Sequence, residues 1–114
     1  IALGLFVAPL LGRSKAFGVL SGGAVGICGA SAALAIASVL PRDKDSERDT
    51  ILTVVTVTAM STVCMILYPL LAARLGLSQN QAGVFLGGTI HDVAQVVGAG
   101  YSISPAVGDT ATYV

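Results

Sequence analysis

The chain has 114 residues, of which 54% are apolar and only 11% are charged, and its formal net charge is zero. Soluble domains are about one quarter charged, so this composition argues against a soluble domain and favours a protein embedded in a lipid bilayer. The zero net charge excludes a strongly basic nucleic-acid-binding protein. The sequence holds no phosphate-binding loop, dinucleotide motif or zinc-ligand spacing, so we expect neither a cofactor nor a metal.

Apolar runs of about 20 residues can cross a bilayer core roughly 30 Å thick, and the segments 16–40 and 50–73 both reach that length. Because the chain starts inside an apolar run and stops at Val114 without a polar tail, we expect both ends to be internal to a longer protein. The sequence predicts a single all-α transmembrane domain over 1–114. Its expected elements are a cut helix over 1–12, a helix over 16–40 that is broken near 26–31, a loop over 41–49, a helix over 50–73, a loop over 74–80, a broken helix over 81–100 and a tail over 101–114.

The segment 16–40 is unusually rich in glycine, which is a poor helix former. Gly18, Gly22, Gly26 and Ala30 recur every four residues, a spacing that lets a neighbouring membrane helix approach closely. Alternatively, residues 26–31 form an unwound break, which is tolerated at membrane depth only where it faces protein or a watery cavity. Both interpretations stay open, and they are compatible.

The segment 81–100 predicts a second break, at the glycine pair 87–88. His91 and Asp92, which follow it, are the only ionisable side chains inside the apolar segments, and such residues usually mark a transport pathway. If a helix restarts at Thr89, that residue caps it and Gln95 shares a face with His91. The free N–H groups of such a helix start suit an anion. Across both breaks, the candidate substrate-binding residues are Gly26, Cys28, Gly29, Ser31, Gly87, Gly88, Thr89, His91, Asp92 and Gln95.

Two motifs resemble the YeiH-type sulfate exporter family: residues 26–32 read GICGASA, and residues 89–100 read TIHDVAQVVGAG. The resemblance continues through 68–69, 75–78 and 103–105, so it covers nearly the whole chain. It implies a multi-pass protein of the bacterial inner membrane, with several more helices than this chain holds. It also implies a fold similar to that of the bile-acid and sodium symporters, with paired repeats and crossed, broken helices.

The function that this resemblance implies is export of a small anion, sulfate or a related oxyanion, by a secondary transporter and not by an enzyme. His91 and Asp92 would then supply coupling to a proton or cation, or gating, and Asp92 stands where many members carry Glu. Two alternatives stay open. In a membrane-embedded enzyme, His91, Asp92 and Cys28 would converge around one cavity. In a structural membrane subunit, the helices would run continuously through Gly29 and Gly88.

The basic residues do not orient the chain if 16–40 crosses the membrane as one helix. Arg13, Lys15 and Arg74 then lie on one side, and Arg42, Lys44 and Arg48 lie on the other. The positive-inside rule compares the Lys and Arg content of the two sides, so the sequence alone gives a tie.

Overall fold

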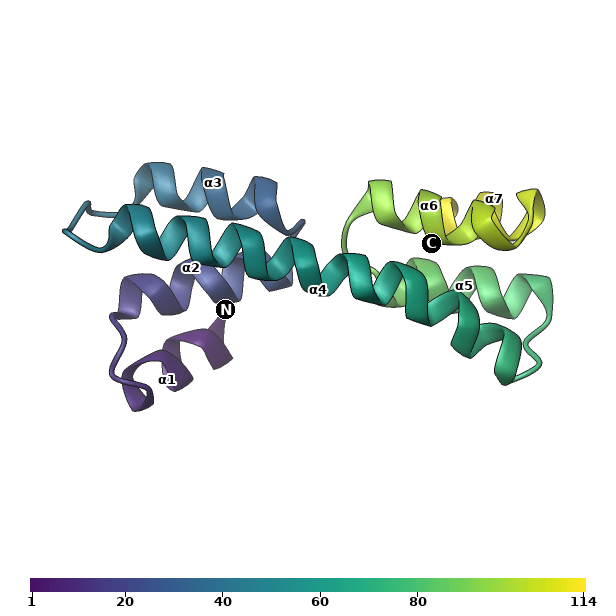
Figure 1. Cartoon of the computed structure of the whole chain (residues 1–114), viewed down its shortest axis with the longest axis horizontal. Coiled ribbons are helices and arrows are strands. Elements are labelled where there is room, and N and C mark those ends of the chain that lie inside the picture. Colours follow the sequence, from purple (N-terminus) through teal and green to yellow (C-terminus); the bar gives the residue numbers. More distant parts are fainter. The chain divides into compact units, whose positions relative to one another are not determined.

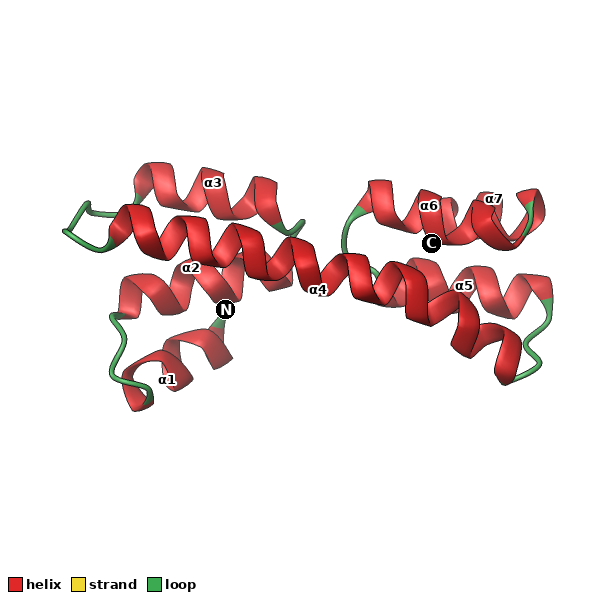
Figure 2. Ribbon diagram, in the orientation of Figure 1, coloured by secondary structure: helices red, strands yellow, loops and turns green.

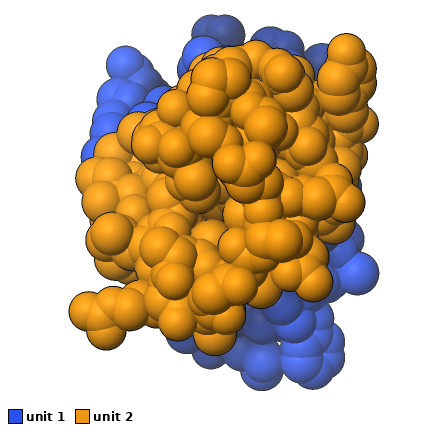
Figure 3. Space-filling view, turned by 90° about the vertical axis from the view of Figure 1, so that its right-hand side faces the viewer, with its two compact units in different colours: residues 1–59 blue, residues 60–114 orange.

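The computed structural model describes all residues, 1–114, and contains only helices and loops (Figure 1, Figure 2). The predicted all-α class is therefore confirmed. Contacts divide the chain into two compact units, Ile1–Ala59 and Met60–Val114 (Figure 3), which are described separately below. The helices are α1 (Ala2–Leu10), α2 (Lys15–Gly26), α3 (Ala30–Val39), α4 (Ser46–Arg74), α5 (Gln79–Thr89), α6 (Val93–Ile103) and α7 (Pro105–Tyr113).

In the first unit, α1 and α2 pack as an antiparallel pair through glycines. A Cβ on Gly18 would clash with the backbone of Gly4, and a Cβ on Gly22 would press against the backbone of Ile1. The close approach that the four-residue spacing predicts is therefore present at these two positions. Gly26 differs, because a Cβ there would meet nothing within 4 Å.

After residues 27–29 the chain reverses, and α3 runs back along α2. Gly23 of α2 lies directly against Ile36 of α3, while Leu20, Ala24 and Ala33 form a small buried cluster between the two helices. The predicted break near 26–31 is therefore present, at residues 27–29, and the alternative of one continuous helix over 16–40 is wrong. Gly29 makes the reversal possible, because its φ of 68° and ψ of −125° suit glycine and strain other residues.

One helix, α4, is long and apolar enough to cross a membrane. Its 29 residues correspond to about 43 Å of helix, against a bilayer core of roughly 30 Å. It starts at Ser46, four residues before the predicted start. The Ser46 hydroxyl accepts a hydrogen bond from the Asp43 N–H and donates one to the Asp43 carboxylate, and these bonds fix the start of the helix. Hydrogen bonds from that hydroxyl and from the Asp45 N–H hold the pKa of Asp43 below its ordinary value.

In the second unit, α5, α6 and α7 enclose a core with the end of α4. Its buried side chains include Leu86, Val96, Val107 and Ala72. The predicted tail over 101–114 is wrong, because α6 continues to Ile103 and α7 follows at once. The Ser104 hydroxyl accepts a hydrogen bond from the Val107 N–H, and Pro105 occupies the first helical position, where a missing N–H costs nothing.

Candidate functional site

Each unit contains a reversal of the chain, inside an apolar region, that holds or adjoins predicted site residues. The first, the α2–α3 tip, comprises residues 27–29, and the second, the α5–α6 tip, comprises residues 90–92. The predicted site residues lie at or next to these tips. Each tip is described within its own unit.

At the α2–α3 tip, Cys28 and Ser31 hydrogen-bond to each other. The Ser31 hydroxyl donates to the carbonyl oxygen of Cys28 at 3.1 Å, and the Cys28 sulfur lies 2.9 Å from the Ser31 oxygen. Gly29 is the N-cap of α3, and no side chain bonds to the first N–H groups of that helix.

The α5–α6 tip lies three residues later than predicted. α5 runs unbroken through Gly87 and Gly88 and ends at Thr89, whose hydroxyl donates to the Phe85 carbonyl at 2.6 Å. The predicted break within 81–100 is therefore present, at residues 90–92, but its predicted position at the glycine pair is wrong. Gly87 permits close packing, since a Cβ there would clash with the carbonyl oxygen of Ala111 in α7, whereas a Cβ on Gly88 would meet open space.

Asp92, not Thr89, caps the following helix. Its carboxylate accepts a hydrogen bond from the Ala94 N–H at 3.0 Å, and α6 begins at Val93. The predicted restart at Thr89 is wrong because the Thr89 hydroxyl is already used inside α5, and because Asp is a somewhat better N-cap than Thr. Asp92 therefore has a structural role whatever else it does.

The predicted polar stripe of His91 and Gln95 does not form on one helix face. His91 is exposed in the tip and precedes α6, whereas Gln95 lies within the first turn of that helix. The side-chain oxygen of Gln95 is buried and has no hydrogen-bond partner. Leaving such a group unpaired costs about 1–3 kcal/mol, so the start of α6 carries a polar atom that its own contacts do not satisfy.

The two tips differ in electrostatics. At the start of α6, a carboxylate of the protein itself occupies the positive end of the helix dipole. At the start of α3, the cap is Gly29, which brings no side chain and no charge. The positive end of the helix dipole is therefore without a protein counter-charge at the start of α3, whereas a carboxylate neutralises it at the start of α6.

One polar pair was missed at the sequence level because it lies in the supposed tail. The Tyr101 hydroxyl donates to the Asp109 carboxylate at 2.6 Å and joins α6 to α7. Ser104 followed by Pro105 is a frequent start of a helix and could have indicated one that contains Asp109. In the structure that helix, α7, packs against α6.

Replacing Asp92 should separate its capping role from its charge. Asp92→Ala removes the cap of α6, and we expect a loss of about 1 kcal/mol of stability. Asp92→Asn keeps a capping oxygen and should stay within a few tenths of a kcal/mol of the parent, because Asn and Asp cap about equally well. Thermal unfolding of the full-length protein in detergent measures both. An equal loss in the two variants would show that the charge, not the cap, stabilises this tip.

Comparison with known proteins places the chain in a membrane family. A UPF0324 membrane protein of Chlorobaculum tepidum is 64% identical over 114 residues, which cover 100% of this chain and 32% of that protein. The UPF0324 membrane protein TauZ of Paracoccus denitrificans is 60% identical over 114 residues, which cover 100% of this chain and 34% of that protein. The chain thus spans about one third of the length of these curated relatives.

No solved structure matches the chain, so the expected likeness to the bile-acid and sodium symporter fold stays a prediction. The expected family relationship is confirmed, and so is the coarser expectation of a membrane protein, because the curated relatives carry that name. The family described as "Conserved hypothetical protein 698" matches residues 1–114. Since that match covers the whole chain, the chain belongs to the Conserved hypothetical protein 698 family, with the UPF0324 membrane proteins as its relatives.

Proposed function

We propose that the chain is part of a secondary transporter that exports a small anion, sulfate or a related oxyanion, across the bacterial inner membrane. The observation that carries this proposal is the start of α3, which lies inside an apolar segment and has no side-chain cap. A helix start of this kind presents N–H groups and the positive end of the dipole, the features that bind anions. The sulfate label comes from the family resemblance.

The dimensions of the hairpin support a site inside the membrane. The 12 residues of α2 extend about 18 Å and the 10 residues of α3 about 15 Å, so the tip would reach roughly the middle of a 30 Å bilayer core. Irregular backbone at that depth requires a protein or aqueous environment. The structural-subunit hypothesis requires helices that continue through Gly29 and Gly88. The helix is continuous at Gly88 but broken at Gly29, so only one of the two requirements is met.

The α5–α6 tip supplies the groups for coupling in this proposal. Asp92 caps α6 through one carboxylate oxygen, and the neighbouring His91 is exposed. A carboxylate next to an imidazole is a common means of binding and releasing a proton in transporters. The remaining helices of the full-length protein would complete both sites.

The test is efflux of labelled sulfate from membrane vesicles that contain the full-length protein. We expect the parent to move sulfate along an imposed gradient. Asp92→Asn and His91→Ala should reduce the rate by about tenfold or more, which corresponds to roughly 1.4 kcal/mol of activation free energy. Asp45→Asn, an exposed loop carboxylate removed in the same way, is the matched control and should transport like the parent.

Each negative result has a defined meaning. A parent that moves no sulfate contradicts the substrate, and other small anions should then be tried in the same vesicles. A parent that transports while Asp92→Asn is fully active contradicts the coupling role of Asp92. Because that variant keeps the cap, a loss of activity cannot be attributed to an unfolded tip.

A further inference from the structure

The basic residues of the first unit are brought together by its fold. Arg13, in the turn between α1 and α2, lies 3.5 Å from the carboxylate of Asp49, near the start of α4. Asp49 is mostly buried, and Arg48 contacts the same carboxylate at 3.4 Å. The α1–α2 turn and the α3–α4 loop therefore meet at one end of the unit.

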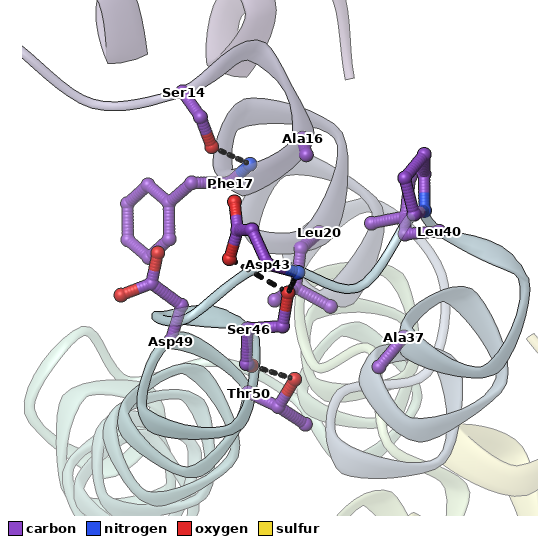
Figure 4. A pocket seen from close by; sticks show the side chains of 11 residues that line it. Ser14, Ala16, Phe17, Leu20, Ala37, Leu40, Asp43, Ser46, Asp49 and Thr50 are labelled. Atoms are coloured by element: carbon purple, nitrogen blue, oxygen red, sulfur yellow. Dashed lines mark hydrogen bonds between the residues drawn. The ribbon is translucent and has the colours of Figure 1, made fainter.

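A small pocket confirms that these two segments are neighbours (Figure 4). Ser14 and Phe17, at the start of α2, line it together with Asp43, Ser46 and Thr50, from the α3–α4 loop and the start of α4. The two segments are separated in sequence by the whole α2–α3 hairpin. We name this end of the first unit, residues 11–15 and 40–49, the basic end.

The basic end contains five of the six Lys and Arg residues of the chain. The sixth, Arg74, lies in the last turn of α4. The sequence predicts equal numbers of Lys and Arg on the two sides of the membrane only if 16–40 crosses it. The reversal at Gly29 removes that condition. The five residues at the basic end are Arg13, Lys15, Arg42, Lys44 and Arg48.

We propose that the basic end faces the cytoplasm, and that the α2–α3 hairpin enters and leaves the membrane from that side. Short loops rich in Lys and Arg stay in the cytoplasm, and acidic residues contribute little to this rule, so the four carboxylates in the same loop do not offset the bias. The anionic headgroups of the cytoplasmic leaflet attract such a cluster.

The contacts of Arg13 suit a position at the membrane surface. Its guanidinium lies over the ring of Phe17, 5.5 Å from the centroid, and also pairs with Asp49. An aromatic ring with a cation above it matches the boundary between acyl chains and headgroups. The crossing by α4 then brings Arg74 and the following loop to the periplasmic side. This orientation rests on charge and chain direction and does not depend on the transported substrate.

Labelling of single cysteines tests the proposal. The full-length protein, with its native cysteines replaced, receives one cysteine at Leu11, Glu47 or Asn80, all exposed and none of them a cation. A membrane-impermeant maleimide is added to inside-out and to right-side-out vesicles. We expect Leu11→Cys and Glu47→Cys to be labelled in inside-out vesicles and not in right-side-out ones, and Asn80→Cys to show the reverse.

The outcomes separate the two parts of the proposal. Labelling of Leu11→Cys and Glu47→Cys from opposite sides would show that 16–40 crosses the membrane, which overturns the hairpin. Labelling of both from the outside would overturn the orientation. Trypsin gives a second measurement that needs no substitution, since the parent should be cut after Arg42 or Lys44 in inside-out vesicles only. Cleavage after Arg42 or Lys44 in right-side-out vesicles would contradict the proposal.

Discussion

Gly29→Ala is expected to destabilise the full-length protein by about 1–3 kcal/mol, the usual cost of holding a non-glycine residue in such a backbone conformation. The φ of Gly29 is 68° and its ψ is −125°, and the α2–α3 reversal depends on this geometry. The variant should therefore unfold at a lower temperature in detergent. It should also lose sulfate efflux, because the start of α3 would no longer be held at the tip.

Gly26→Ala is the matched control for this prediction. Gly26 ends α2 in the same apolar stretch, its φ is not positive, and an added Cβ would meet nothing within 4 Å. Alanine is the better helix former by about 1 kcal/mol within a helix, so we expect Gly26→Ala to be neutral or slightly stabilising. Equal destabilisation by the two substitutions would show that the tip tolerates no side chain at all and that backbone strain is not the cause.

Gly87→Ala should destabilise the second unit by about 1–3 kcal/mol, the usual cost of adding a methyl group where there is no space. The added Cβ would clash with the carbonyl oxygen of Ala111, and it would lie 2.9 Å from the Cβ of Val114. Since backbone is harder to displace than the end of a side chain, α7 would have to move away from α5. Thermal unfolding of the full-length protein measures the loss.

The adjacent glycine gives the control for the same helix. Gly88 lies one residue further along α5, where an added Cβ has open space. Gly88→Ala should therefore leave stability unchanged or raise it slightly, through helix propensity alone. If Gly88→Ala were as destabilising as Gly87→Ala, the close packing against α7 could not explain the effect. A neighbour in the full-length protein would then occupy the space beside Gly88.

The sequence predicted the helices and the membrane family but not the direction of the chain. An apolar run of 25 residues has the same composition whether it crosses a bilayer once or folds back at its centre. The difference depends on Gly29, one of five glycines in the run, and only the structure shows that it alone of these has a positive φ. A length criterion cannot detect such a reversal.

The second tip was misplaced for a different reason. Thr89 and Asp92 are both good N-caps, and the sequence does not show which of them is free to act. The hydroxyl of Thr89 bonds to Phe85, which extends α5 past the glycine pair and leaves Asp92 to begin α6. That competition is settled by local hydrogen bonds and not by residue type. The start of α7, by contrast, could have been predicted from Ser104 and Pro105, which are typical of the first positions of a helix.

The carboxylate of Asp92 also acts as a tethered ligand of its own helix. It already occupies the N–H of Ala94, where a free anion would bind. The positive end of the α6 dipole is thus neutralised from within the chain. An anion from outside would gain less at the start of α6 than at the start of α3, where the cap is a glycine without a side chain.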